Sequence, residues 1–94
     1  MTQECFLDVS DLEPPEPLVR ALDAVKALSE EQYLHLKHRR KPCLLYENIE
    51  PLGFVADTRD GGEGMCEVFI WKKGNEAVER IARSAAKALP PWQE

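Results

Sequence analysis

The chain has 94 residues, 44% of them hydrophobic and 31% charged, with a formal net charge of −5. That length accommodates one compact domain, and the ordinary apolar fraction excludes a wholly disordered chain. No apolar run approaches the roughly 20 residues of a membrane-spanning helix, and the first residues lack the features of a secretory signal. Three cysteines without a CxxC motif are typical of a reducing compartment, so we predict a cytoplasmic protein.

Charge is distributed unevenly along the chain. Residues 1–31 contain eight acids and two bases, residues 32–46 contain four bases and no acid, and residues 47–94 contain nine acids and six bases. A nonspecific nucleic-acid binder needs a broad basic surface, because contacts with phosphates supply most of its affinity. One basic segment in an acidic chain therefore argues against nucleic-acid binding and is compatible with a site for a single small anion.

The first third of the chain predicts a strand, a rigid loop and a helix. An alternating apolar pattern over residues 5–9 indicates the strand. Three prolines between positions 14 and 17 exclude both a strand and a helix interior, and Pro17 suits the first position of a helix. Apolar residues at helical spacing from Leu18 to Leu28 predict an amphipathic helix of about three turns.

A second strand and a second helix follow. Residues 33–38 alternate again, and His35 and His38 lie on opposite faces of that strand because they are three residues apart. The basic segment 39–41 ends the strand. We expect the second helix to begin at Pro42 and to end at Gly53, a natural C-cap.

The last third of the chain predicts a β-hairpin and a third helix. Alternating runs over residues 54–59 and 65–72 are joined by the glycine-rich segment 60–64, which is typical of a hairpin. Asn75 is suited to cap a helix that continues to about Leu89, where two prolines end it.

Three aromatic residues, Phe54, Phe69 and Trp71, are expected on the sheet face opposite the first two helices. That face is exposed in a two-layer sandwich unless something covers it. We expect the third helix to cover it within the chain. A homodimer through the exposed sheet face or through that helix is the alternative.

This order of elements predicts the fold class. A β-α-β unit makes the first two strands parallel with a right-handed crossover, and the hairpin adds an antiparallel pair. We therefore predict an α/β (α+β) two-layer sandwich, in which a β-α-β-α-β-β chain forms a mixed four-stranded sheet with two helices on one face. This sandwich would occupy residues 1–74, and residues 75–94 would form a C-terminal helical extension.

Parallel strands end at the same edge of a sheet, so the loops after the first two strands should lie side by side, where α/β proteins commonly bind ligands. The candidate binding edge comprises Glu13, Pro14, Pro15, Glu16, Pro17, His38, Arg39, Arg40 and Lys41. A glutamate there would serve as a general base or cation ligand, and the basic residues would hold an anion. The alternatives are helix capping, ion pairs between the two loops, and a solvated loop.

Cys43 is the candidate reactive thiol. It follows three basic residues and lies in the first turn of the predicted second helix, and both features favour the thiolate form. The alternative is an ordinary, partly buried cysteine. Cys5 and Cys66 share faces with apolar residues and are expected in the core. His38 and Cys43 together supply only two metal ligands, so neither a metal nor another cofactor is predicted.

The segment Leu12-Glu13-Pro14-Pro15-Glu16-Pro17 resembles the signature of the TusA/SirA-like sulfur-carrier proteins, which carry Leu-x-Cys-Pro-x-Pro between the first strand and the first helix. The resemblance covers about residues 4–73 and implies the same sandwich. In the sulfur carriers the cysteine of the motif accepts a persulfide sulfur. Pro14 takes its place here and has no nucleophile, so the resemblance does not imply persulfide transfer.

The sequence is more similar to one branch of that superfamily, domain-of-unknown-function family 2249. The similarity lies in Leu-Glu-Pro-Pro-Glu-Pro, in the Pro-x-x-Leu-Tyr that follows the basic loop at 42–46, and in a hairpin whose second strand ends near Trp71. Members of this branch occur in bacteria joined to hemerythrin-like domains, which implies redox or nitrogen-oxide physiology.

We therefore predict a non-enzymatic binding or adaptor module that presents the 13–17 and 39–43 edge to a protein partner or a small anionic ligand. The alternative is a thiol or redox participant in sulfur or nitrogen-oxide metabolism that acts through Cys43. No catalytic residue is assigned, and neither a nucleic acid nor a membrane is an expected partner.

Overall fold

Seven elements follow one another in the predicted order in a computed structural model that describes residues 1–93. They are β1 (Gln3–Asp8), α1 (Glu16–Lys26), β2 (Gln32–His38), α2 (Cys43–Ile49), β3 (Phe54–Gly62), β4 (Met65–Lys72) and α3 (Glu76–Ala86). No helix among these residues has the length and apolar character needed to cross a membrane. The predicted fold class is confirmed.

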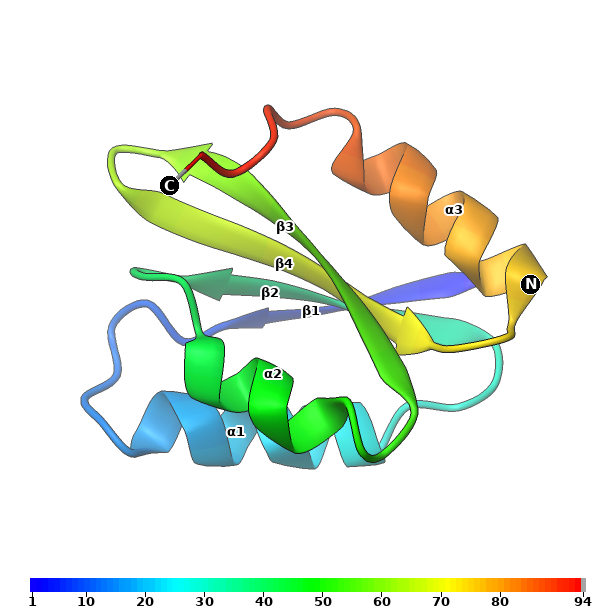
Figure 1. Ribbon diagram of the computed structural model, residues 1–94, viewed down its shortest axis with the longest axis horizontal. Helices are drawn as coiled ribbons and strands as arrows, with labels where there is room; N and C mark the ends of the chain where they lie inside the picture. The colour runs from blue at the N-terminus through cyan, green and yellow to red at the C-terminus, as the bar shows by residue number, and fades with distance from the viewer. Residues whose placement is uncertain (94) are drawn as a thin grey trace.

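The four strands form one mixed sheet in the order β1-β2-β4-β3 (Figure 1). β1 and β2 are parallel because α1 connects them across one face, and β4 runs antiparallel to both of its neighbours. β4 pairs with β2 on one side and with its hairpin partner β3 on the other, so β4 lies inside the sheet and β3 lies at its edge. The two parallel strands end together, and the loops that follow them leave from the same edge of the sheet.

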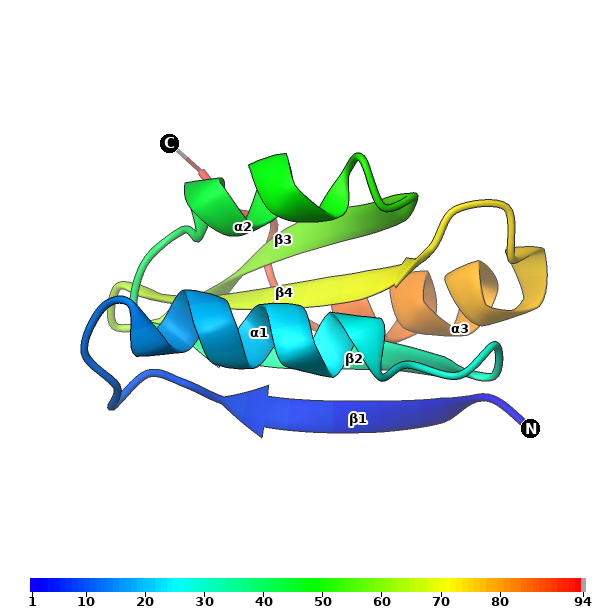
Figure 2. The same ribbon diagram turned by 90° about the horizontal axis from the view of Figure 1, so that it is seen from below.

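α1 and α2 lie side by side on one face of the sheet (Figures 1 and 2). Every second residue of each strand points toward them, as the alternating patterns predict. The buried core on this side consists of Val9, Ala21, Val25, Leu34, Leu36, Leu45, Ile49, Cys66, Val68 and Ile70. These helices thus bury one face of the sheet and hold the two loops at its edge.

α3 packs on the opposite face of the sheet (Figure 1). The expectation that the third helix covers this face within the chain is therefore confirmed. The buried side chains between them are Tyr33, Phe69 and Trp71 of the sheet and Val78, Ala82 and Ala86 of the helix. Alanines on the contact face let the helix approach the aromatic rings closely. The guanidinium carbon of Arg83 lies 4.9 Å from the centre of the Trp71 ring, so the cation covers its outer side.

The expected position of Phe54 is wrong. Val55 stands opposite Trp71 in the β3–β4 register, and opposite residues of neighbouring strands share a face. Val55 therefore faces α3, whereas Phe54 packs on the α1–α2 side, where the Lys72 ammonium lies 4.8 Å from its ring centre. Counting aromatic residues could not reveal which of two neighbouring positions points to which face.

Helix ends differ modestly from the predictions. α1 begins at Glu16, one residue before Pro17. α2 ends at Ile49, and the turn after it closes at Gly53, whose φ of +87° suits glycine. α3 ends at Ala86, three residues before Leu89. Isolated turns with i→i+3 hydrogen bonds continue the chain beyond α2 and α3.

The tail after α3 returns to the open edge of β3. The Asp60 amide donates to the Pro90 carbonyl oxygen (2.9 Å), and Arg59 and Pro91 form an isolated antiparallel bridge. The Arg59 guanidinium also binds the Asp57 carboxylate at 3.0 and 3.1 Å. The tail thereby pairs with backbone groups that would otherwise present an unprotected strand edge.

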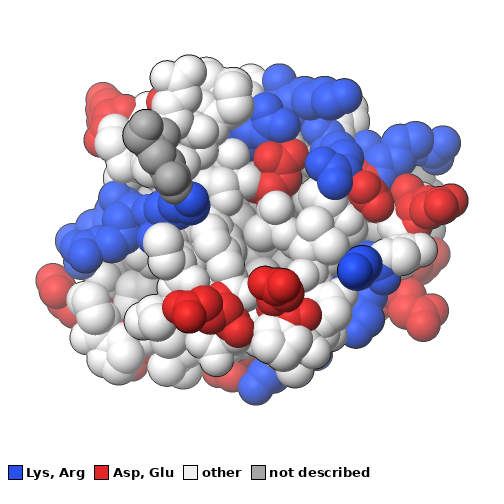
Figure 3. Space-filling view, viewed as in Figure 1, with Lys and Arg blue, Asp and Glu red and all other residues white. Residues whose placement is uncertain are grey.

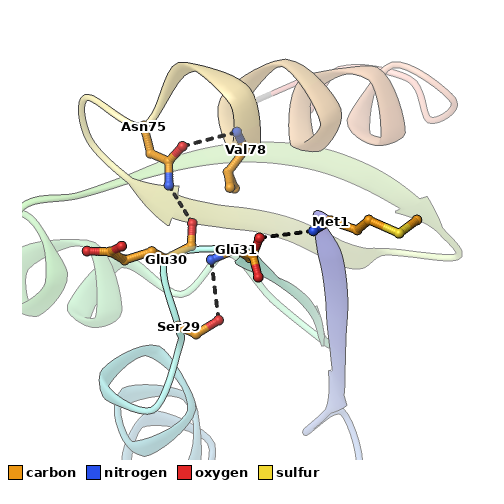
Figure 4. A network of polar contacts seen from close by, with 6 residues as sticks. All are labelled: Met1, Ser29, Glu30, Glu31, Asn75 and Val78. Atoms are coloured by element: carbon orange, nitrogen blue, oxygen red, sulfur yellow. Dashed lines mark hydrogen bonds and ion pairs between the residues drawn. The ribbon is translucent and has the colours of Figure 1, made fainter.

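Asn75 caps α3 as predicted and also connects α3 to the loop before β2 (Figure 4). Its side-chain oxygen accepts from the Val78 amide (3.3 Å), and its side-chain nitrogen donates to the Glu30 carbonyl oxygen (2.5 Å). The amino group of Met1 binds the Glu31 carboxylate in the same network (2.9 Å). These contacts set where α3 begins relative to the sheet.

Candidate functional site

A pocket of about 350 Å³ opens at the edge where β1 and β2 end. One side is formed by the loop after β1 and the start of α1, and the other by the loop after β2 and the start of α2. Seven of the nine predicted edge residues line it, together with Cys43. They are Pro14, Pro15, Pro17, His38, Arg39, Arg40 and Lys41. Glu13 and Glu16 do not line it, so the structure separates the predicted glutamates from the pocket itself.

Apolar side chains make most of the pocket wall. Leu12, Leu18 and Ala21 contribute from the α1 side, and Leu44 and Leu45 contribute from α2. Leu45 and Ala21 belong to the buried core, so the inner wall is held rigidly. Leu44 is 63% exposed and lies at the rim. The pocket therefore offers an apolar surface that is already in place before anything binds.

Arg39 ties the two loops together. Its guanidinium donates to the Leu12 carbonyl oxygen at 2.9 Å and lies 3.7 Å from the Glu13 carboxylate. The predicted alternative of an ion pair between the loops is thus realised for Glu13. Glu16 instead binds Arg20 one turn along α1 at 3.3 Å, and both side chains are too exposed for that pair to add much stability.

Arg40 differs from Arg39 although the two are adjacent. Within residues 1–93 the Arg40 side chain makes no hydrogen bond or ion pair, and it is exposed at the pocket rim. Figure 3 shows basic side chains at the left-hand end of the molecule, where Figure 1 places the segment between β2 and α2. Arg40 therefore carries a positive charge that a bound anion can meet.

His38 provides a neutral hydrogen-bond donor beside that charge. Its Nδ1 accepts a hydrogen bond from the Arg40 backbone amide (3.1 Å), so the proton of the neutral ring is on Nε2. Burial lowers the pKa of the His38 imidazole, and the positive charges of Arg40 and Arg39 lower it further. The ring is consequently neutral at pH 7.

The three cysteines differ in exposure. Cys43 is exposed in the first turn of α2 and lines the pocket, whereas Cys66 is fully buried in the core. Burial raises the pKa of the Cys66 thiol to about 12, which keeps it protonated and inert. Cys5 is partly buried and packs against the same core. All three thiols are free.

A second polar cluster lies on the other face of the sheet, and sequence reasoning missed it. His35 faces Glu4 through Nδ1 (3.3 Å) and Glu67 through Nε2 (2.5 Å), and its ring stacks on Phe69 with the ring centres 4.3 Å apart. The exposed ring of Phe6 meets its edge. These contacts link β1, β2 and β4. Alternation alone places the residues on one face, but only the strand register brings them into contact.

Histidine, cysteine and carboxylate side chains do not converge into a metal site in the described part of the chain, where no group of three or more could hold an ion. His38 and Cys43 both line the pocket, yet they remain two ligands where a stable site needs at least three.

Together, the fold and this site define a small α+β protein with a mixed sheet and a preformed pocket at the end of its parallel strands. The chain belongs to the uncharacterized conserved protein family DUF2249, which it matches over residues 6–72. The match begins within β1, includes β2, β3, β4 and both pocket loops, and ends before α3. No curated protein and no solved structure matches the chain.

Proposed function

We propose that this protein is a non-catalytic binding module whose pocket accepts an apolar group together with an adjacent negative charge. The observation that carries the proposal is the combination of apolar walls with the Arg40 cation and the His38 donor at one rim. Binding sites for organic ligands commonly have this form, in which apolar surface supplies affinity and a few polar groups fix orientation.

The charge distribution of the chain supports this proposal. The protein carries −5 overall, so it repels anions in general. The basic segment 39–41 is a local exception, and its three residues line the pocket. An anion is therefore attracted to a place where apolar contact is also available.

We also propose that the family is a branch of the TusA/SirA-like superfamily in bacteria and that the protein is cytoplasmic. The shared β-α-β-α-β-β order supports the first point, and three free thiols support the second. Pro14, at the position of the sulfur-accepting cysteine, lines the pocket. Under this proposal the branch retains the location of the superfamily's site but has replaced its covalent chemistry with binding.

Binding of 8-anilinonaphthalene-1-sulfonate, an anion with an apolar body, tests the proposed module. We expect Arg40→Glu to weaken binding at least about fivefold, roughly 1 kcal/mol, because a repulsive charge replaces an attractive one. Leu44→Asp should weaken it similarly by removing apolar contact at the rim. Fluorescence titration in about 0.15 M salt, where the Debye length is about 8 Å, measures both.

Two substitutions of the same type serve as matched controls for this titration. Arg80→Glu changes an exposed arginine of α3, and Leu52→Asp changes a leucine that is 42% exposed outside the pocket. Both should leave binding within about twofold of the wild type, because surface charges beyond a Debye length are screened. Equal losses in the control and pocket variants, or no binding by the wild type, would refute the module.

A redox role through Cys43 is the second candidate, favoured by the exposure of this thiol in the same pocket as His38. It predicts that iodoacetamide alkylates Cys43 at least about tenfold faster than free cysteine at pH 7, as expected for a stabilised thiolate. Mass spectrometry measures the rate at Cys43, and the buried Cys66 serves as an internal unreactive control. A Cys43 rate equal to that of free cysteine would eliminate this role.

A further inference from the structure

The neutral His38 ring at the pocket rim has one defined hydrogen-bond donor. Because the Arg40 amide occupies Nδ1, the neutral ring of His38 has only its Nε2–H left to offer. The ring is partly buried and lines the pocket, and Arg40 supplies a side-chain cation from the loop that follows β2. A ligand at this rim thus meets one neutral donor and one positive charge.

We propose that the pocket binds a small organic carboxylate with an apolar chain, whose carboxylate accepts from His38 Nε2–H beside Arg40 and whose chain lies along the leucine-lined wall. This inference rests on the proposed binding function and adds the class of ligand. The pocket volume of about 350 Å³ falls within the usual range for small organic ligands.

The arrangement favours a single negative charge over a phosphate. Phosphate sites normally combine several charged donors, whereas Arg39 is already engaged by the Leu12 carbonyl oxygen and the Glu13 carboxylate. A carboxylate requires fewer partners, and His38 with Arg40 can supply them. An inorganic anion would leave the wall formed by Leu18, Leu44 and Leu45 in contact with water, whereas an alkyl chain covers that wall.

The affinity of the pocket for a carboxylate should depend on pH. The charged and titratable groups around His38 are Arg39, Arg40 and Lys41 of the loop that follows it, Cys43 of α2, and Cys66, which stands opposite it on β4. The nearby cations and burial hold the free ring neutral. A bound carboxylate opposes that effect and favours the protonated ring, in which Nδ1 carries the second proton and no longer accepts from the Arg40 amide. Ligand binding then takes up a proton, so affinity rises as pH falls from 8 to 6.

Calorimetric titration of the full chain with octanoate, compared with octanol, tests this proposal. We expect octanoate to bind more tightly than octanol and to gain about twofold to sixfold in affinity between pH 8 and pH 6, because a pKa rise of up to one unit, from a value below that of a free histidine, takes effect only partly at pH 6. His38→Gln keeps a side-chain N–H donor but cannot titrate, so it should bind octanoate at pH 8 and lose the pH dependence.

NMR of the wild-type protein tests the proposal even if His38→Gln folds poorly. The pKa of His38 in the wild type, followed by NMR of the imidazole ring, should rise when octanoate saturates the pocket. Equal affinities for octanol and octanoate, an unchanged His38 pKa, or a pH dependence retained in a folded His38→Gln variant would each overturn the proposal. If the anilinonaphthalene sulfonate still binds with the expected variant pattern, only the carboxylate assignment fails. If neither probe binds, the binding module fails as well.

Discussion

Replacing Trp71 with alanine is expected to lower the free energy of unfolding by about 3–5 kcal/mol. Trp71 is fully buried between the sheet and α3, and it has the largest side chain among the fully buried residues. Its removal leaves a cavity that the alanines of α3 cannot fill. A domain of this length has a total stability of about 5–14 kcal/mol, so the loss is a large fraction of the whole.

Urea denaturation followed by far-ultraviolet circular dichroism measures this loss. Trp71→Phe is an informative companion, because the Trp71 Nε1–H is buried without a hydrogen-bond partner among the described residues. Phenylalanine removes that unpaired group and retains most of the ring contact, so it should cost less than half as much as alanine. Trp92→Ala, in the partly exposed tail, should also cost less. If the three variants lost equal stability, Trp71 would not be the anchor of α3.

Ending the chain after Gly74 is expected to prevent the remainder from folding as a stable monomer. Without α3, the rings of Tyr33, Phe69 and Trp71 face water. At about 1.5–3 kcal/mol for each buried side chain, the loss is about 5–9 kcal/mol, which is comparable with the whole stability of the domain. Size-exclusion chromatography with light scattering, together with near-ultraviolet circular dichroism, measures the outcome.

Ending the chain after Leu89 is the matched control for this truncation. It keeps α3 and removes only the tail that pairs with the edge of β3. This shorter truncation should remain monomeric and folded with a modest loss of stability. A monomeric 1–74 chain that unfolds cooperatively, within about 2 kcal/mol of the full chain, would show that residues 1–74 do not depend on the C-terminal extension.

Local patterns in the sequence predict most of the fold correctly. Alternation in Cys5, Leu7 and Val9 orients β1, and the same period assigns Phe69 and Trp71 to the face opposite Val68 and Ile70. These predictions succeed because the side-chain direction in a strand depends only on the position of a residue relative to its neighbours. Asn75 likewise caps α3 through a contact three residues away.

Local patterns do not determine how strands that are far apart in the chain pair with one another. Phe54 is expected on the wrong face because local alternation does not say which face of β3 meets α3, and the pairing of Val55 with Trp71 decides it. The cluster of Glu4, His35 and Glu67 joins three strands and depends on two registers. Helix boundaries also shifted, because tertiary packing and turn formation decide where the last hydrogen bonds are made.

The sequence predicts which two loops lie side by side, but it does not predict how the residues within them differ. Parallel strand order predicted that the 13–17 and 39–43 segments meet, and the structure brings them around one pocket. Arg39 and Arg40 were equivalent in sequence. In the structure the first ties the loops and the second remains available to a ligand. The His38 tautomer likewise follows from a hydrogen bond that no spacing rule predicts.

By itself, the sequence determined the order of the elements, the faces of most strands and the position of a basic segment beside a proline-rich loop. Those properties depend on neighbours within a few residues along the chain. The tertiary structure alone decided which loop residues become the pocket wall, which arginine keeps an unpaired charge and how α3 closes the second face. Those properties depend on contacts between residues far apart in the chain, which exist only when the whole sheet has formed.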